Sequence, residues 1–529
     1  MRRAAIAVVA AAIAACAPKV RYEKPAPTAA PPAFKETQDW KLSTPAAEIP
    51  RGAWWTIFQD PQLDALEAAI DVSNQTLKIQ EARFRQARAA LGITSSQRFP
   101  TITATPSISG VEPSGNRSGA PAHSATGDFL LPVDLSYEAD VWGRIRQATA
   151  AARAEMQATA ADIESVRLSL HAELASDYFQ LRGVDAEKAL LDNSVAAFQR
   201  ALDLTRSRFQ GGIASQADVA QAETQLETTR AAAVDIQAER AGLEHAIAEL
   251  VGKAPSEVTI APLPLDTPPP SIPAGLPSEL LERRPDIAAA ERRVAEASAN
   301  LGVARAAFFP RLLLTAGGGF ESTSIARWIT GLSTFWSAGP ALAVTLADGG
   351  RRRAGVQQAQ AVYDESVAGY QAAILQSLRE VEDSLASLRV LQQEADVQAS
   401  AVAAAERSLT LATNRYRGGV TSYLEVITAQ NAALTNERAA VSILARRLVT
   451  SVLLVKALGG GFRVSSLTTT NSQLQVVNSQ FPTPTPNRQL TTPTPNRQLT
   501  TPTATWQRHS RTFNLGSRTP TCARSQGGR

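Results

Sequence analysis

One long stretch in the second half of the chain repeats an apolar residue at every seventh position. These positions are Ile374, Val381, Leu388, Ala395, Val402 and Leu409. Heptad spacing of this kind is typical of long helices that pack side by side. Because no Pro interrupts residues 350–417, the pattern predicts a single helix, which at 1.5 Å per residue is roughly 100 Å long.

The first half of the chain carries the same apolar phase 207 residues earlier. Its members are Leu174, Leu181, Val195 and Leu202. Ala supplies most of the other apolar positions, and small side chains let helices pack closely into a wall. A simple two- or four-helix coiled coil fits the same spacing, so the heptads alone leave both arrangements open.

Four other segments alternate apolar residues with Thr, Ser and Gly, which is the pattern of a β-strand. They span residues 100–110, 127–139, 310–320 and 337–347. Each has about ten residues, the length of a strand that crosses a bilayer. Trp328, Phe335 and Trp336 lie between the last two of these segments. Aromatic residues are enriched where a protein meets a membrane interface. Ordinary surface hairpins are the alternative, but they leave unexplained why each hairpin lies directly between long helices.

The chain is internally duplicated. The stretch "RFQGGIAS" at residues 208–215 returns as "RYRGGVTS" at residues 415–422, and three further landmarks recur at offsets between 207 and 210. Such a set in one order indicates a tandem repeat. The repeats span residues 60–255 and 278–458, joined by a Pro-rich linker at 256–277. We expect each to contain a helix, two strands, a very long helix, a Gly-Gly turn and a long helix.

Four strands cannot close a barrel, and an open sheet edge in hydrocarbon leaves backbone groups without hydrogen-bond partners. A barrel would therefore be shared between copies of the chain. Two copies supply eight strands, whose bore side chains fill, whereas three supply twelve, wide enough for a passage. With each chain internally doubled, three copies predict a pseudo-sixfold wall in which the helices continue the barrel as a second tube.

The two ends of the chain differ from its body. Residues 1–15 combine Arg2 and Arg3 with a short apolar run, as a secretory signal does. An Ile-Ala-Ala triplet then precedes Cys16, which resembles the acylated Cys of bacterial lipoproteins and predicts a lipid-anchored N-terminal segment over residues 16–59. An ordinary signal with an incidental Cys is the alternative. Residues 464–529 form a low-complexity tail that we expect to be disordered.

Charge and side-chain chemistry exclude several classes of protein. The net charge is +4, but without the seven Arg of the tail and the two of the signal the body carries −5, which argues against a nucleic-acid partner. The four His residues lie apart without metal-ligand spacing, and no catalytic set is present. We therefore expect no enzyme, no cofactor and no metal site.

Several motifs occur in the order found in one family. They are "WWTIFQDPQLDAL" at residues 54–66, "LLERRPDI" at 280–287, two Phe-Pro junctions and two Gly-Gly turns. From Cys16 to about Leu458 the chain resembles the outer-membrane factor (TolC-like) family. More narrowly, it resembles the lipoprotein branch that serves resistance-nodulation-division (RND) multidrug efflux systems.

The resemblance implies a mainly α fold with a β-barrel part. Three chains would form a twelve-stranded transmembrane barrel, four strands from each, continuous with a periplasmic α-barrel of long antiparallel helices. It also implies an outer-membrane location, contact with outer-membrane lipid, a periplasmic adaptor and an inner-membrane RND pump as partners, and small amphiphilic compounds as cargo. Two alternatives stay open: a lipid-anchored periplasmic coiled-coil scaffold without a pore, and an outer-membrane duct for type I protein secretion.

Each Gly-Gly turn would join a very long helix to the long helix that follows it. We call these turns, at the periplasmic end of the helices, the tips. We expect the first Gly of each pair to take the left-handed conformation that ends a helix, and Ser215 or Ser422 to cap the next helix through its hydroxyl. By resemblance, the adaptor meets these tips. The candidate contact residues are Arg208, Gly211, Gly212, Ser215, Arg415, Arg417, Gly418, Gly419 and Ser422.

Three charged residues near the turns are candidates for a gate. Asp218 and Glu425 occupy equivalent positions in the two repeats, and Arg417 lies close to them in the sequence. One hypothesis is an ionic latch that holds the end of the tunnel shut, with Arg417 as its most distinctive member. The other is that these charges are solvated and complement the helix dipoles.

Overall fold

The computed structural model describes residues 22, 24–25, 34–37, 52–112, 125–265, 267–272 and 283–460. The signal, Cys16 and the tail at 464–529 lie outside these residues. The α-helices are α2 (Pro61–Ser73), α3 (Gln75–Ser96), α4 (Arg144–Gln210), α5 (Gln216–Leu250), α7 (Pro285–Ala306), α8 (Arg351–Arg417) and α9 (Tyr423–Ala457). Short 3-10 helices are η1 (Lys35–Thr37), η2 (Trp54–Phe58), η3 (Pro255–Glu257), η5 (Ile325–Arg327) and η6 (Gly331–Ser333).

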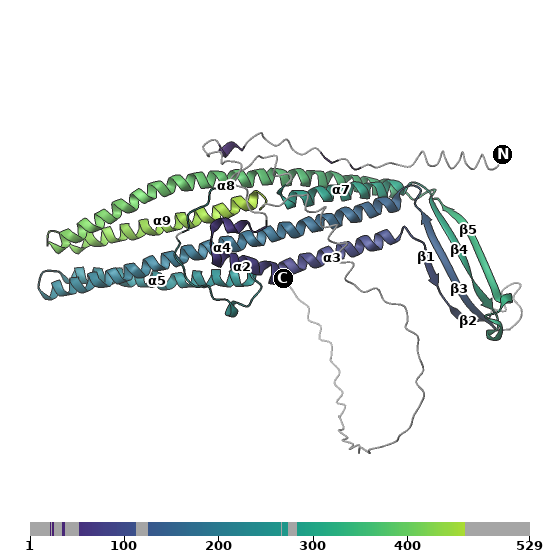
Figure 1. Ribbon diagram of the computed structural model, residues 1–529, viewed down its shortest axis with the longest axis horizontal. Coiled ribbons are helices and arrows are strands. Elements are labelled where there is room, and N and C mark those ends of the chain that lie inside the picture. The colour runs from purple at the N-terminus through teal and green to yellow at the C-terminus, as the bar shows by residue number, and fades with distance from the viewer. Residues whose placement is uncertain are drawn as a thin grey trace, which may run out of the picture. The chain divides into compact units, whose positions relative to one another are not determined.

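The two halves of the described chain contain matching helices. Helices α4 and α8 have 67 residues each, α5 and α9 have 35 each, and α3 and α7 have 22 each. In the first half α4 packs against both α3 and α5, and in the second half α8 packs against both α7 and α9. The two halves meet where α4 packs against α7 and α9 (Figure 1). The single long helix that the heptads predict is therefore present in each half.

The heptad positions form the packed face of these helices. Leu174 and Leu181 of α4 and Val381 of α8 have no exposed surface. Towards the far end of α8 the same positions are only half-buried, as at Leu409. None of the helices within the described ranges has both the length and the hydropathy that a membrane-spanning helix requires.

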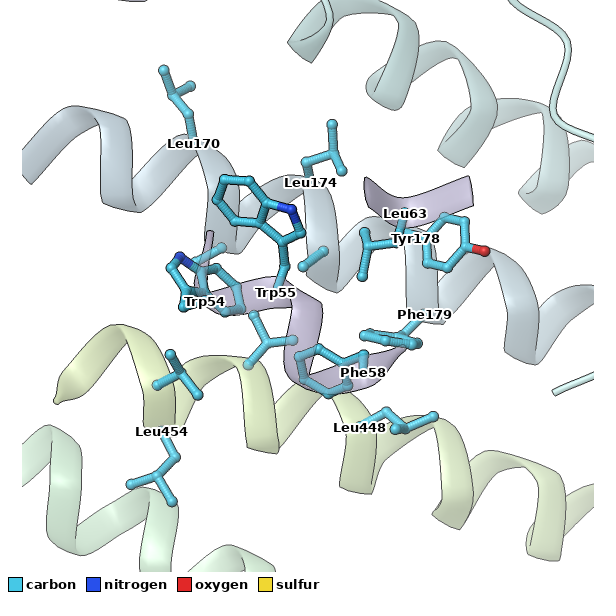
Figure 2. Close-up of a cluster of buried hydrophobic side chains, with 14 of the residues drawn as sticks. Trp54, Trp55, Phe58, Leu63, Leu170, Leu174, Tyr178, Phe179, Leu448 and Leu454 are labelled. Carbon is cyan, nitrogen blue, oxygen red and sulfur yellow. The ribbon is translucent and has the colours of Figure 1, made fainter. Parts of the chain in front are cut away.

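The largest core cluster forms where η2 enters between the two repeats. Trp54, Trp55 and Phe58 of η2 are all buried. Figure 2 shows them beside apolar side chains of α2, α4 and α9, namely Leu63, Leu174, Tyr178, Phe179, Leu448 and Leu454. The Trp-Trp motif therefore packs into the core that holds the halves together.

The strands form one antiparallel sheet, in which the first predicted strand is divided. The strands are β1 (Thr101–Ala104), β2 (Ser107–Val111), β3 (Thr126–Ala139), β4 (Arg311–Ser322) and β5 (Thr334–Ala343). Both β1 and β2 pair with β3, which pairs with β4, which pairs with β5. The prediction of one strand over 100–110 was wrong, because pairing stops at Thr105 and Pro106. Pro has no N–H to donate to a ladder.

The last strand also differs from its predicted bounds of 337–347. It begins at Thr334, which pairs with Phe320, and it ends at Ala343, which pairs with Arg311. Arg311 is the first residue of β4 and follows Pro310. Residues 344–347 are outside the strand because β4 offers them no partner.

The register gives the sheet one apolar and one polar face, because successive side chains point to opposite sides. Paired residues on the apolar face are Ile102, Ile108, Phe129, Leu131, Val133, Leu135, Leu312, Leu314, Phe320, Trp336 and Leu342. The other face is mainly polar: its paired residues include Thr103, Ser109, Asp128, Asp134, Ser136, Thr315, Glu321 and Ser337, with Leu130, Leu313 and Phe335 as its large apolar members. Within the described residues, β1 and β2 form one open edge and β5 forms the other.

The glycine run in β4 is explained by close approach of the neighbouring strand. A Cβ at Gly319 would lie 2.0 Å from the carbonyl oxygen of Leu131, and one at Gly317 would lie 2.7 Å from Asp134 Oδ1. Any larger residue at Gly319 would therefore push β3 and β4 apart.

Equivalent Asp residues connect the sheet to the long helices. The carboxylate of Asp140 accepts hydrogen bonds from the backbone N–H groups of Ile145 and Arg146 at the start of α4. Asp348 accepts from the N–H groups of Gly350 and Arg352 at the start of α8. These bonds satisfy amides that a helix start leaves free, so each strand passes into its helix through a fixed turn.

A buried acid–imidazole pair links α2 to α4. Glu67 Oε2 lies 2.6 Å from His171 Nδ1, and the Trp55 ring stacks on the imidazole at 4.4 Å between centroids. Burial, with Asp71 and Asp64 nearby, raises the pKa of Glu67 to about 10. Burial also lowers the pKa of His171 to about 4. At neutral pH the Glu67 carboxyl therefore keeps its proton and donates it in a hydrogen bond to neutral His171.

This pair predicts a fall in stability as the pH rises above neutrality. Above about pH 6.5 His171 is neutral in both states, whereas unfolded Glu67 has lost the proton that the folded protein retains up to about pH 10. The unfolded state then binds fewer protons, so the free energy of unfolding falls by up to about 1.4 kcal/mol per pH unit. Glu67→Gln should flatten this fall in urea unfolding between pH 7 and 9.

The matched control is Glu81→Gln, which removes an exposed carboxyl from α3 and should keep the wild-type pH dependence. Equal pH slopes for wild type and Glu67→Gln would contradict a protonated Glu67.

Candidate functional site

The two Gly-Gly turns lie at the ends of the long helices that are farthest from the sheet (Figure 1). Helix α4 starts five residues after the end of β3 and α8 starts eight residues after the end of β5, and each reaches its turn 67 residues later. At 1.5 Å per residue, each helix separates its turn from the sheet by about 100 Å. The repeats thus place two similar tips at the same end of the bundle.

Both turns end their helices with the same backbone motif. Gly212 and Gly419 have a φ of 74°, whereas Gly211 and Gly418 keep φ values of −80° and −74°. The N–H of Ile213 donates to Arg208 O at 2.8 Å, and that of Gly212 donates to Phe209 O at 2.9 Å. This is the Schellman arrangement. The second Gly, and not the first as predicted, therefore holds the left-handed conformation.

The two helix starts after the turns are capped differently. Ser215 Oγ accepts from the N–H of Asp218 at 3.1 Å, and Asp218 Oδ2 accepts from the N–H of Ser215 at 2.9 Å. This reciprocal pair is a capping box. Ser422 occupies the equivalent N-cap position but makes no capping hydrogen bond through its side chain, so that prediction was wrong. Glu425, which is longer than Asp218, lies 3.7 Å from Arg415 instead.

The structure does not bring the three candidate gate residues together within one chain. Asp218 is engaged in its capping box, and Glu425 faces Arg415. Arg417 is exposed, and no ion pair or hydrogen bond joins its side chain to any other described residue. A latch that includes Arg417 would therefore need a partner outside this chain.

One contact that the sequence reasoning missed joins the two tips. Arg208 Nη1 donates to Tyr416 O at 2.6 Å, and the guanidinium lies over the Tyr416 ring at 4.5 Å from its centroid. The Tyr416 hydroxyl lies 3.3 Å from Thr205 Oγ1. The sequence holds one sign of this contact, which is that an aromatic residue follows Arg in both turns, Phe209 in the first and Tyr416 in the second.

The outermost residues of both tips are apolar and exposed. Ile213 and Val420 are 71% and 72% exposed, and Phe209 is 44% exposed. Apolar side chains at exposed turns are suited to contact with another protein. Within the described part of the chain, no group of His, Cys, Asp and Glu residues has an arrangement that could hold a metal ion.

Comparison with known proteins identifies the family. A model of the outer membrane efflux protein family matches residues 67–253 and 276–460. The chain therefore belongs to the outer membrane efflux protein family, and its place is the outer membrane.

Two curated relatives illustrate the similarity. The probable efflux pump outer membrane protein TtgC of Pseudomonas putida is 31% identical over 464 residues, which cover 86% of this chain and 95% of that protein. The outer membrane protein OprJ of Pseudomonas aeruginosa is 31% identical over 477 residues, covering 87% of this chain and 97% of its own.

Solved structures agree with this assignment. The outer-membrane channel OprN superposes with a TM-score of 0.78 at 30% identity, covering 84% of this chain and 99% of its own. A structure of CusC, described as forming a transmembrane channel, superposes with a TM-score of 0.75 at 27% identity, covering 84% of this chain and all of its own.

The left-handed glycines make a prediction about the tips. Gly212→Ala places a Cβ on a left-handed residue and should weaken the turn by about 1–2 kcal/mol, which is roughly 5- to 30-fold. Hydrogen exchange of peptides that cover residues 208–218 should speed up by that factor. In Gly211→Ala the new Cβ meets nothing closer than 3.6 Å at an ordinary φ, so exchange should stay near wild type. Equal effects at both positions would contradict the assignment.

Proposed function

We propose that this chain is the outer-membrane channel subunit of a tripartite efflux system, in which it is a passive exit duct for drugs or other small amphiphilic compounds. The observation that carries the proposal is the sheet, which has one apolar face, one polar face and two open edges. Such a sheet fits the wall of a transmembrane barrel, with lipid on one side and water on the other.

Three copies satisfy the requirement that the barrel has no edge. Counting β1 and β2 as one interrupted strand, each chain supplies four strands, so three chains supply twelve and enclose a passage. The α-helices would then form a second tube around the same axis, with two similar hairpins from each chain. The pore-free scaffold is disfavoured because it gives the apolar face of the sheet no role, and no observation favours a protein-secretion duct over an efflux duct.

The tips are the proposed docking place for a periplasmic adaptor, which would connect the duct to an inner-membrane RND pump. Exposed Ile213 and Val420 would supply the apolar contact, and the charged residues of both tips, Arg208, Arg415 and Arg417, would surround it. Relatives are named for efflux of toluene, antibiotics or cations, which indicates that cargo varies among ducts of this family. We place the choice of cargo in the pump.

Lipid anchoring at Cys16 is a further part of the proposal. Three described residues that follow Cys16 contact the second repeat: the Tyr22 hydroxyl donates to Glu291 Oε1 of α7 at 2.5 Å, and the N–H groups of Lys35 and Glu36 donate to Glu382 of α8. Tyr22 is about 22 Å from the sheet end of α7, since 15 residues of helix follow Glu291. The six residues back to Cys16 can span about 20 Å, which would bring Cys16 close to the sheet end of α7 and to the adjoining membrane leaflet. Palmitate incorporation that persists in Cys16→Ser would refute it.

Electrical recording from purified protein in planar bilayers tests the proposal. The duct should give discrete conductance steps, because three chains enclose a water-filled passage. Trp336→Asp, which puts a charge on the apolar face of the sheet, should reduce the number of inserted channels. Ser337→Asp, its neighbour on the polar face, is the matched control and should insert normally. A protein that enters the bilayer without any current, both as wild type and as Arg417→Ala, would support the scaffold.

The latch is tested in the same recordings. If Arg417 holds the tips closed through a partner outside its own chain, Arg417→Ala should raise the single-channel conductance and sensitise cells to vancomycin. Thr421→Ala changes an uncharged neighbour and is the control. Unchanged conductance and sensitivity would assign Arg417 to the solvated surface.

A further inference from the structure

The contact between the two tips of one chain has a direction. Arg208, at the end of α4, reaches to the end of α8, where it donates to Tyr416 O and covers the Tyr416 ring. Arg208 is half-buried by this contact. An Arg from the first hairpin thus holds an aromatic residue and its carbonyl on the second hairpin.

The tandem repeat supplies a second set of the same groups. At the offset of 207 residues, Arg208 corresponds to Arg415, and Phe209 corresponds to Tyr416. At these equivalent positions each tip therefore carries a guanidinium followed by an aromatic ring. Within a chain only Arg208 and Tyr416 are joined, which leaves Arg415 and Phe209 as the unused pair.

Both unused groups are accessible and suited to the same contact. Phe209 is 44% exposed and the Arg415 side chain is 57% exposed. Arg415 has an ion pair with Glu425, but at 3.7 Å between two exposed side chains it is worth less than about 1 kcal/mol and can be exchanged. Phe209 O accepts from the N–H of Gly212, and Tyr416 O accepts in the same way from that of Gly419 while it also accepts from Arg208. The carbonyl at this position of the turn can therefore take a guanidinium donor in addition to its backbone donor.

We propose that Arg415 of one copy binds Phe209 of the partner subunit, donating to its carbonyl oxygen and lying over its ring, so that one Arg–aromatic contact recurs between all neighbouring hairpins of the ring. This inference rests on the proposed assembly of three chains. In a ring of equivalent hairpins every Arg must point the same way round. Arg208 points from the first hairpin to the second, so Arg415 points from the second hairpin to the first hairpin of the next chain.

The interface between hairpins of neighbouring chains differs in its apolar packing from the interface between the two hairpins of one chain. The cluster under the Arg208 contact consists of Phe198, Leu202, Ala222, Leu226, Tyr416, Tyr423 and Val426. Their counterparts at the repeat offset are Ala405, Leu409, Ala429, Ala433, Phe209, Gln216 and Val219. Three large apolar or aromatic residues are replaced by Ala405, Ala433 and Gln216. Less apolar surface is therefore available at the interface between chains, so the Arg415 contact contributes a larger share of the stability of that interface.

Cross-linking of paired Cys variants tests the inference in the full-length protein purified in detergent. In a Cys522→Ser background, Phe209→Cys with Arg415→Cys should be joined by a short bismaleimide into covalent dimers and trimers on denaturing gels. The matched control, Arg208→Cys with Tyr416→Cys, should be joined within single chains and keep the mobility of a monomer. Each single variant should give no ladder.

Two other outcomes separate this inference from the proposed function. Amine-reactive cross-linking of the same samples reports the assembly independently of the tips. If that reagent gives trimers while the Phe209–Arg415 pair gives no ladder, or is linked within one chain, the inter-chain contact is wrong and the duct stands. If both reagents give only single chains, the contact and the duct are both overturned.

Discussion

The structure depends on one constraint, which is that a β-sheet in hydrocarbon cannot leave its edge amides and carbonyls without partners. The sheet of this chain has an apolar face that suits lipid, yet β1, β2 and β5 end it with open edges. The described strands are too few to join those edges into a closed barrel. In the proposed assembly other copies of the chain supply these partners, and the number of strands in each chain then sets how many chains the assembly needs.

The positions of the long helices depend on the positions of the strands. Asp140 and Asp348 fix the passage from strand to helix at equivalent places, so the spacing of the strands is transmitted into α4 and α8. Each of these helices then packs against one shorter helix near the sheet and another near the tip. The core around Trp54, Trp55 and Phe58 joins the repeats midway. The turns beyond it expose the apolar residues Ile213 and Val420, which makes the tips a suitable place for docking.

The sequence predicted what local pattern controls. Heptads and the absence of Pro gave the bounds of α8 to within one residue. The alternation of apolar and polar residues gave the bounds of the strands to within a few residues. Pro106 was a sign in the sequence that the first strand could be divided. Whether a Pro divides a strand depends on whether the neighbouring strand, here β3, needs an N–H donor at that position, which the local sequence does not show. The left-handed residue of each turn depends on which carbonyl accepts the last helical hydrogen bond, which the Gly-Gly pair does not reveal. Arg208–Tyr416 and Glu67–His171 join residues 208 and 104 positions apart, and no local signal specifies such pairs.

The central claim is that the sheet is completed only by other copies of the chain. The most direct test is the mass of the detergent-solubilised protein by native mass spectrometry, with circular dichroism of the same sample to verify that the strands are folded. The account predicts a complex of three chains with β-structure intact. A folded, strand-containing single chain would show that its edges need no partner, and would contradict the account.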